Sequence, residues 1–441
     1  MVSSGTIIEK QYGELAINGG KPVRSEPLPL EFPGGHYIGQ EEIDAVCDVL
    51  RRKSPFRYYG LEKIGQCDSF EKEFAAFCSR KHALGVNSGT AALSIALSAL
   101  GVGPGQEVLV PGYLWVSTVS AIVRSGAIPV LVDVDDTFCM DPADIKKKIT
   151  TRTSTILVVH MSGAAGRLDE ILAIAKQKNL KVLADCAQAN GASYKGKPVG
   201  SYGDIAIFSL QLNKNMTTGE GGMLVCDDTH LYKRAFACHD MGYARNEDGR
   251  LDPSDGRYQL WGQGSRMTEI TAAMGRVQLR KLPQIIEHMR TAKYKIRNSL
   301  ADIAGLQLRQ ITDTSGDSGA FLICMFPTGA VCDSFIAALR AEGIAPPPIG
   351  CSNITMSQWG LHIYYNITSL VNKTSVSADG YPWTHLLNKE SNYSYGKGTL
   401  PYLDDLVSRS SIMAIPSVLT DADIDDIITA FHKVAAHIPL K

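Results

Sequence analysis

The feature that most constrains the fold is a regular alternation of short apolar segments and helical segments between about residues 40 and 280. Turn residues bound each apolar segment, and few polar side chains interrupt it. Such runs are typical of parallel strands that are buried on both faces of a sheet. The seven predicted strands are His82–Val86, Gln106–Val110, Ile128–Val132, Thr155–His160, Lys181–Ala184, Asp204–Ser209 and Met223–Cys226.

Helical segments lie between most of these strands and would cover the two faces of the sheet. Their apolar residues recur with the spacing of one helix face. We therefore predict an α/β fold whose large domain holds a seven-stranded, mostly parallel sheet. The predicted helices are Glu41–Lys53, Ser69–Cys78, Thr90–Leu100, Trp115–Arg124, Pro142–Ile149 and Leu168–Lys178.

The sequence changes character after this region, which predicts a second and smaller domain. A long helical segment, about 267–301, would connect the two domains, and residues 352–402 are irregular and rich in Tyr and Asn. The last segment, Asp421–Ala436, has the spacing of an amphipathic helix. The predicted division is an N-terminal extension over 1–40, a large domain over 41–285, and a connecting helix with a small C-terminal α+β domain over 286–441.

The charge balance disfavours some classes of partner. The chain has 44 Lys plus Arg and 45 Asp plus Glu, so its formal net charge is −1. That balance gives no field to attract nucleic acid or an anionic membrane. Because we also find no signal peptide and no apolar run of roughly 18 residues, we expect a cytoplasmic protein with neither partner. The ten cysteines form no CxxC pair, and we predict no metal site.

Three segments that follow predicted strands stand out, because ligands of an open parallel sheet bind beyond the carboxyl ends of its strands. The first, Asn87-Ser88-Gly89-Thr90, opens a helix. Its free N–H groups and small side chains could hold a phosphate, and an ordinary helix cap is the alternative.

The second and third segments carry a carboxylate and an amine. Asp185 ends a buried strand, where its charge needs a cation or strong donors; a helix or turn cap is the alternative. Lys214 lies in a polar loop before the Gly-rich turn Gly219-Glu220-Gly221-Gly222. A Lys in a pocket can have a lowered pKa and form a Schiff base, whereas most lysines are solvated on the surface.

These segments together match the needs of one cofactor, pyridoxal 5'-phosphate (PLP). PLP needs a Lys that binds its aldehyde, an acid that faces the pyridine nitrogen, a phosphate site and a flat group against the ring. Trp115, just after another strand, could be that flat group, although a core aromatic is the alternative. The shared position of all four at strand ends favours the cofactor.

The chain also resembles a known family, the fold-type I PLP-dependent sugar aminotransferases of the DegT and DnrJ group, from about residue 15 to 440. The resemblance rests on several stretches, of which the Lys-containing GEGG motif with the upstream Asp-x-x-Gln is highly specific. They are LAINGGKPVR, NSGTAALSIAL, VLVPGYLWVSTVSAI, ADCAQANGASYKGKPVGSYGDIAIFS, NKNMTTGEGGMLV and RMTEITAAMGRVQLRKL.

The resemblance implies roles for individual residues in PLP binding and catalysis. It makes Lys214 the Schiff-base lysine and the proton carrier, Asp185 the partner of the pyridine nitrogen and Gln188 the donor to the ring oxygen. Trp115 would stack on the ring. The phosphate would be held by Ser88, Gly89, Thr90 and Ser209. A related branch that dehydrates sugars has His in place of the lysine, so Lys214 favours transamination.

Two further residues are candidates for the substrate side, and one position departs from the family. His160 lies in the family's His-x-x-Gly region, and a satisfied histidine at a strand end is the alternative. Arg57 could bind a carboxylate in a bidentate manner, and a surface Arg is the alternative. At Gly264 relatives carry an Asn that reaches the phosphate of the neighbouring subunit of a dimer, and Gly lacks that side chain.

The resemblance implies a homodimer with shared active sites and a ping-pong reaction. Glutamate or glutamine would give the amino group, and a keto or aldehydo sugar would receive it. Short matches, PFRYYG, GDSGAFL and SRSSIMAIP, favour the transaminases that make 8-amino-3,8-dideoxy-octulosonate. The SLQLNK context instead favours glutamine-dependent scyllo-inosose aminotransferases, and nucleotide-sugar aminotransferases are a third reading. An inactive PLP-binding regulatory protein is the alternative of another class.

Overall fold

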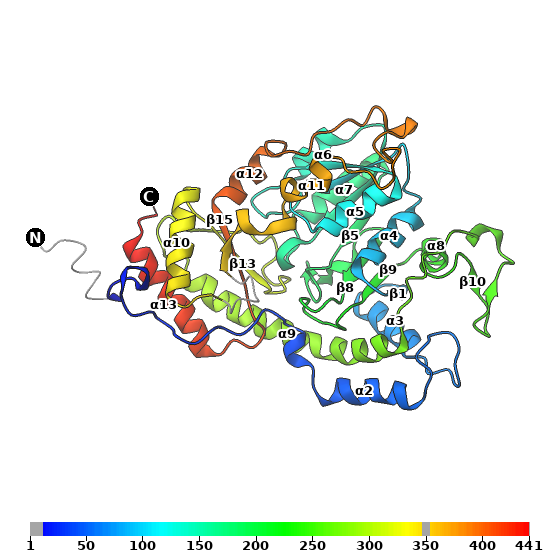
Figure 1. Cartoon of the computed structure of the whole chain (residues 1–441), viewed down its shortest axis with the longest axis horizontal. Coiled ribbons are helices and arrows are strands. Elements are labelled where there is room, and N and C mark those ends of the chain that lie inside the picture. Colours follow the sequence, from blue (N-terminus) through cyan, green and yellow to red (C-terminus); the bar gives the residue numbers. More distant parts are fainter. Residues whose placement is uncertain (1–11, 346–352, 441) are drawn as a thin grey trace, which may run out of the picture.

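A computed structural model describes residues 12–345 and 353–440 of the chain. Residues 1–11, the start of the predicted N-terminal extension, lie outside the described residues. Two main sheets form in the described part, one of seven strands and one of four. The long helix α9 (Glu269–Ser299) runs from the large sheet to the small one (Figure 1).

The seven-stranded sheet has the order β1-β9-β8-β5-β4-β2-β3. Its strands run parallel except β9, which pairs antiparallel with β1 and β8. The predicted mostly parallel sheet is therefore confirmed, and every predicted strand is present with its ends shifted by two residues or fewer. The strands are β1 (His82–Val86), β2 (Glu107–Pro111), β3 (Ile128–Val132), β4 (Thr153–Val159), β5 (Lys181–Asp185), β8 (Ile205–Ser209) and β9 (Gly222–Cys226).

Helices cover both faces of this sheet, as its apolar strands require. Alternate residues of one strand point to opposite faces: Leu183 enters one core cluster, whereas Val182 and Ala184 enter the other. On the Leu183 face lie α4 (Gly89–Leu100), α5 (Val116–Ser125) and α8 (Thr229–His239). On the other face lie α3 (Gln66–Phe77), α7 (Leu168–Lys178) and α9; α2 (Gln40–Arg51) packs on α9, and α6 (Pro142–Lys148) follows β3.

The four-stranded sheet is antiparallel and belongs to the C-terminal part of the chain. Its order is β12-β13-β15-β14, and it packs with two helices and the end of α9. The strands are β12 (Gln307–Leu308), β13 (Phe321–Met325), β14 (Asn353–Thr355) and β15 (Ser410–Ala414). The helices are α10 (Gly329–Ala341) and α13 (Asp421–His437).

The irregular residues 356–400, which we call the strap, leave the small sheet and cross to the large one. The strap has short helical turns, including α11 (Thr368–Val371), and leads into α12 (Pro401–Ser408). It lies over α5 in Figure 1, where it is coloured orange. Its composition indicated irregular structure but gave no sign of this placement.

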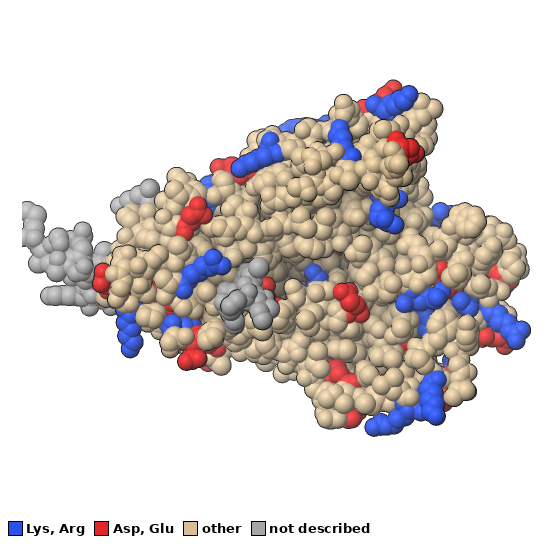
Figure 2. All heavy atoms as spheres, viewed as in Figure 1, with Lys and Arg blue, Asp and Glu red and all other residues tan. Residues whose placement is uncertain are grey.

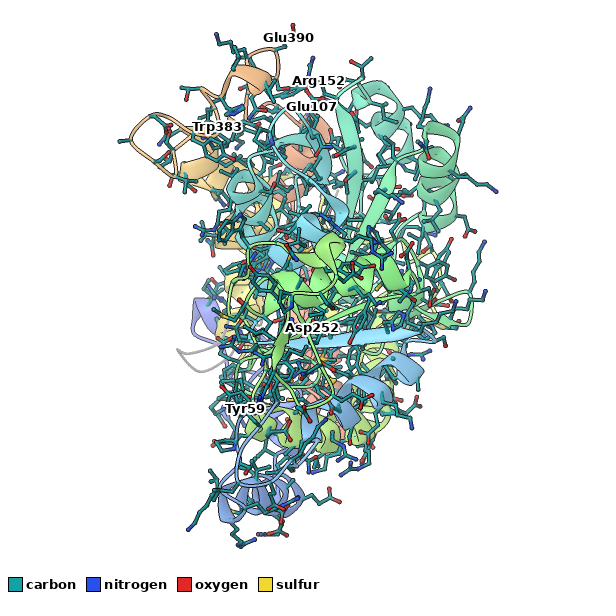
Figure 3. The ribbon with its side chains drawn as sticks, turned by 90° about the vertical axis from the view of Figure 1, so that its right-hand side faces the viewer. Tyr59, Glu107, Arg152, Asp252, Trp383 and Glu390 are labelled. Atoms are coloured by element: carbon teal, nitrogen blue, oxygen red, sulfur yellow. The ribbon has the colours of Figure 1, made fainter. Side chains whose placement is uncertain are left out.

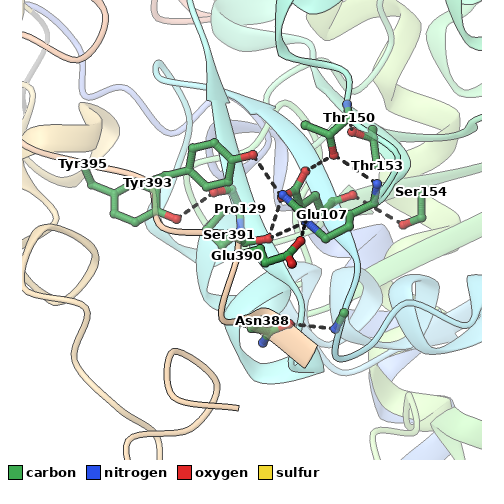
Figure 4. A network of polar contacts seen from close by, with 12 residues as sticks. Glu107, Pro129, Thr150, Thr153, Ser154, Asn388, Glu390, Ser391, Tyr393 and Tyr395 are labelled. Carbon is green, nitrogen blue, oxygen red and sulfur yellow. Dashed lines mark hydrogen bonds and ion pairs between the residues drawn. The ribbon is translucent and has the colours of Figure 1, made fainter. Parts of the chain in front are cut away.

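A buried carboxylate fixes the far part of the strap to the large sheet. Glu107, at the start of β2, is fully buried and accepts hydrogen bonds from Ser391 (2.6 Å), Tyr393 (3.0 Å) and Arg152 (3.0 Å) (Figure 4). Arg152 also binds Glu390 at 2.9 Å. Because a buried charge is costly unless it is paired, these contacts make the strap and the sheet depend on each other. Figure 3 shows Glu107, Arg152 and Glu390 together at one end of the molecule.

Charged side chains of both signs are scattered over the face drawn in Figure 2, without a large area of one sign. None of the helices in residues 12–345 and 353–440 is long and apolar enough to cross a membrane.

Candidate functional site

A cavity of about 440 Å³ lies at the carboxyl ends of the parallel strands. It contains every residue that the sequence predicts for the cofactor, namely Ser88, Gly89, Thr90, Trp115, Asp185, Gln188, Ser209 and Lys214. Each comes from a strand end or from the loop or helix that follows it. The fold thus gathers side chains from segments that are far apart in the sequence, as expected for an open α/β sheet.

The start of α4 has the features of both roles considered for Asn87-Ser88-Gly89-Thr90, namely a helix cap and a phosphate site. Ser88 is the N-cap, and its hydroxyl accepts a hydrogen bond from the N–H of Ala91 (3.0 Å). Gly89 and Thr90 follow, and the first N–H groups of a helix have no partner within it, so they are free for an anion. A Cβ at Gly89 would lie 2.8 Å from the Ser209 Cβ. This close approach requires Gly and brings the Ser209 hydroxyl to the same corner.

Asp185 is held by two donors at the end of β5. One carboxylate oxygen accepts from the N–H of Ala187 and the other from the hydroxyl of Thr118, each at 3.0 Å. Burial raises the pKa of Asp185, while the Ala187 N–H, the Thr118 hydroxyl and the charge of Lys214 act in the opposite direction. The carboxylate is therefore oriented, and it lines the cavity.

Lys214 extends into the cavity from the loop after β8. Its amine makes no hydrogen bond or ion pair with any residue that the structure describes, and burial lowers its pKa against the raising effect of Asp185. The backbone of the loop is fixed, because the Lys214 carbonyl accepts from the N–H of Gly34 (3.2 Å) and the Lys214 N–H donates to Gln211 (2.9 Å). A lysine with a lowered pKa and a free amine is suited to nucleophilic and proton-transfer chemistry.

Trp115 and Gln188 line the remaining sides. Trp115 precedes α5 and leaves 43% of its surface exposed, so its indole is open to the cavity rather than buried in the core. The side-chain oxygen of Gln188 accepts from the N–H of Ser162 at 3.0 Å. That bond fixes the amide while leaving its NH₂ group for a ligand.

The two residues predicted for the substrate do not line this cavity. Arg57 is 3% exposed and forms an ion pair with Glu71 at 2.8 Å. The two predictions for Arg57 were therefore wrong, because it is neither a surface residue nor open to a substrate carboxylate in this chain. His160 is fully buried at the end of β4, and burial lowers its pKa to about 4. Its ring nitrogens have no hydrogen-bond partner among the described residues, so it is not a satisfied histidine either.

Several residues of the cavity were not predicted. Thr118, which donates to Asp185, lies three residues after Trp115, at the start of α5. Residues three apart lie on the same side of a helix, so this spacing could have indicated Thr118. Ser117 accepts from the Thr90 hydroxyl at 2.9 Å. His362 comes from the strap, and no local pattern marks it. Gln211, Asn213 and Glu220 complete the polar lining.

Gly264 lies on an exposed loop. Its φ is +64°, in the left-handed region that favours Gly and Asn, and a Cβ there would meet no atom within 4 Å. An Asn would therefore fit, so the loss of the family's side chain is not forced by the fold of this chain.

The residues of the cavity match the chemical groups of PLP one by one. A helix N-terminus with a serine hydroxyl suits its phosphate, Asp185 suits a protonated pyridine nitrogen, Lys214 suits its aldehyde and Trp115 suits its ring face. When bound, PLP draws electrons from a bond at the carbon that carries the amino group.

Comparisons with known proteins agree with the fold and identify the family. A sequence model of the DegT/DnrJ/EryC1/StrS aminotransferase family matches residues 37–356. The chain is 31% identical to the L-glutamine:2-deoxy-scyllo-inosose aminotransferase of Micromonospora echinospora, over 96% of this chain and 98% of that protein.

Solved structures share the fold of this chain. That of 3-amino-5-hydroxybenzoic acid synthase matches 93% of this chain and 98% of its own with a TM-score of 0.75 and 26% identity. The PLP form of the putative sugar aminotransferase Spr1654 from Streptococcus pneumoniae covers 94% of this chain and 100% of its own, with a TM-score of 0.73 and 24% identity.

The fold and the strand-end cavity define a PLP-dependent transaminase of fold type I. The chain belongs to the DegT/DnrJ/EryC1/StrS aminotransferase family.

Proposed function

We propose that this transaminase moves the amino group of L-glutamine to the ketone of a cyclitol such as scyllo-inosose or its 2-deoxy form. The observation that carries the chemistry is the free amine of Lys214 in the same cavity as the anchored carboxylate of Asp185. The substrate class rests on the likeness to a glutamine-dependent cyclitol aminotransferase over almost the whole length of both proteins.

The residues of the chain would divide the work as follows. Gly89, Thr90 and Ser209 would bind the phosphate, and Trp115 would hold the ring in place. The negative charge of Asp185 would keep the pyridine nitrogen protonated. Lys214 would carry the proton at the reacting carbon of the substrate, and burial, which lowers its pKa, favours the neutral amine that can accept that proton.

The sequence matches that favoured an octulosonate are short, whereas the relative that matches almost the whole length of the chain bears the name of a cyclitol aminotransferase. We therefore place the cyclitol first. A keto or aldehydo sugar, including a nucleotide-linked one, is the second candidate, because Spr1654 is described as a putative sugar aminotransferase and has the same overall fold.

We further propose that two copies of the chain form a dimer. Apolar side chains protrude from two segments that approach each other, since Arg245 lies 4.0 Å from the ring centroid of Tyr58 and Leu260 donates to Gly242 at 2.8 Å. Trp261 is 95% exposed, Leu61 80% and Tyr59 62%. Large exposed apolar residues of this kind mark association surfaces. Light scattering of the purified protein should give twice the chain mass, and Trp261→Arg should shift it toward the monomer; a monomeric wild type would contradict the proposal.

The experiment that tests the function separates its two half-reactions. The purified protein with PLP is mixed with L-glutamine, and the absorbance of the cofactor reports its conversion to the pyridoxamine form. That form is then mixed in turn with scyllo-inosose, 2-deoxy-scyllo-inosose, 8-oxo-3,8-dideoxy-octulosonate and a nucleotide-linked 4-keto sugar. We expect conversion by glutamine and return by a cyclitol. No spectral change with any amino donor would instead support a regulatory PLP-binding protein.

A further inference from the structure

The strap contributes one side chain, His362, to the cavity that the strand ends otherwise form. Its ring lines both the main cavity and a smaller one of about 90 Å³ beside it, which also contains Lys214. It lies between two indoles: its ring centroid is 4.6 Å from that of Trp359, in a stacked arrangement, and 4.7 Å from that of Trp115. His362 therefore borders the space beside the amine that would act on the substrate.

Backbone pairing holds His362 in this place. Its carbonyl accepts from the N–H of Leu114 at 3.0 Å, and two residues later the N–H of Tyr364 donates to Gly112, also at 3.0 Å. The packing favours Gly at position 112, because a Cβ would lie 2.2 Å from a methyl of Leu400 and 2.8 Å from one of Leu403. The strap is thus joined to the loop that carries Trp115, and the two rings are positioned as a pair.

The hydrogen-bonding capacity of His362 follows from its contacts. Nδ1 lies 3.0 Å from the carbonyl of Trp359, which can only accept, so Nδ1 must carry the proton. Burial, helped by the charge of Lys214, lowers the pKa of His362 to about 4, although the hydrogen bond to the Trp359 carbonyl acts in the opposite direction. The ring is therefore neutral near pH 7, and Nε2 is a hydrogen-bond acceptor with no partner among the described residues.

We propose that Nε2 of His362 accepts a hydrogen bond from a hydroxyl group of the amino-group acceptor and so selects polyhydroxylated substrates. This inference rests on the proposed function, because it assigns a residue to the second half-reaction.

The charge of the surroundings favours the acceptor over the amino donor. A neutral acceptor atom gains nothing from an α-carboxylate, which needs donors. Besides Lys214, the described residues of the two cavities include no Lys or Arg, but they do include the carboxylates of Glu31, Asp185 and Glu220. A neutral polyol suits this lining better than an anionic group, and each of its hydroxyls can donate.

Two variants separate the role of Nε2 from the packing of the ring. In His362→Asn the side-chain NH₂ can take the place of Nδ1 at the Trp359 carbonyl, but no atom reaches the position of Nε2. In His362→Gln the longer amide reaches that position and can present its oxygen there. His385→Asn is the matched control, because His385 is also on the strap and its nitrogen caps the turn at Leu387, a task that Asn performs as well.

The two half-reactions are measured separately, with L-glutamine and with the cyclitol or keto sugar that the wild type uses best. For His362→Asn we expect an unchanged rate with glutamine and a loss of about 10- to 100-fold in kcat/KM for the acceptor, the worth of one buried hydrogen bond. His362→Gln should recover part of this loss, and His385→Asn should behave as the wild type. Monodeoxy analogues of the acceptor should show one position at which the wild type loses activity and His362→Asn does not.

Each other outcome is decisive. If both half-reactions fall equally in His362→Asn, the residue has a structural role; if only the glutamine half falls, it recognises the amino donor. If neither changes, Nε2 makes no contact that matters. All three overturn the inference while the proposed function stands. If the wild type uses no polyhydroxylated ketone or aldehyde at all, both proposals fail together.

Discussion

The two walls of the cavity are held in place in different ways. On the strand-end wall, Asp185 is fixed by the N–H of Ala187, two residues later, and by a hydroxyl from the neighbouring helix. On the strap wall, His362 is fixed by backbone bonds to the loop at Leu114, which lies much earlier in the chain. The first wall depends on local sequence, and the second depends on a long-range contact.

This difference explains which wall could be recognised from the sequence. A carboxylate at the end of an apolar strand, as at Asp185, is visible within a few residues of sequence. So is a small or glycine-rich segment after a strand, as around Gly89 and Lys214. A histidine in an irregular segment leaves no such pattern. The same difference separates their expected functions, since the strand-end wall would perform the chemistry and the strap wall would select the substrate.

The largest effect is expected from Lys214→Ala, which removes the amine of the strand-end wall. Transamination should fall by at least about 10³-fold, because both nucleophilic and proton-transfer roles are lost. Steady-state kinetics with glutamine and the best acceptor measures the fall, and the absorbance of bound PLP should change as well. Lys176→Ala on α7, an exposed lysine outside the cavity, is the control. Retained turnover in Lys214→Ala would refute the assignment.

The next effect tests whether the strap wall depends on its far anchor. Glu107→Gln keeps the shape of the side chain but replaces acceptors that Arg152, Ser391 and Tyr393 use. We expect the free energy of unfolding to fall by about 3 kcal/mol, since a buried charge network loses one partner. Denaturant unfolding measures it. If the stability is unchanged, the network does not anchor the strap.

A smaller effect is expected from Thr118→Val, which removes one donor from Asp185 without changing the shape of the site. The hydrogen bond favours the ionised carboxylate, so its loss should raise the pKa of Asp185 further. If the ionised form is needed, activity below neutral pH should decline about ten-fold and the acid limb of kcat/KM should move to higher pH. A lower kcat/KM with an unmoved limb would indicate a packing role only.

The smallest effect concerns His160, which is buried at the end of β4 and has no hydrogen-bond partner among the described residues. Its pKa is about 4 in the folded chain and about 6.5 when unfolded. Between these values the unfolded chain binds the proton first, so stability is full above about pH 6.5 and is lost as the pH falls toward 4. His160→Leu should remove about 1 kcal/mol of the fall between pH 7 and 5.5. His36→Leu, at an exposed position, should leave the curve unchanged.

Much of the fold could be predicted because its signals are local. The strand Ile128–Val132 is apolar throughout and has the predicted bounds, and helix α7 has them too. The environment of Arg57, by contrast, could not be predicted from local sequence. Whether it faces a ligand or a buried partner depends on Glu71, which lies 14 residues away on α3, and nothing near Arg57 reveals that pairing.

The strap has a consequence for how enzymes of this kind can diversify. It is one continuous stretch, anchored at Glu107 and at Gly112, and it holds none of the residues proposed to bind PLP. Residues 356–400 could be exchanged between two members of the family with both anchors kept. The exchange would change the strap wall, which meets the acceptor, and would leave the strand-end wall intact. New specificity could then arise by replacing a single module, with no rebuilding of the active site.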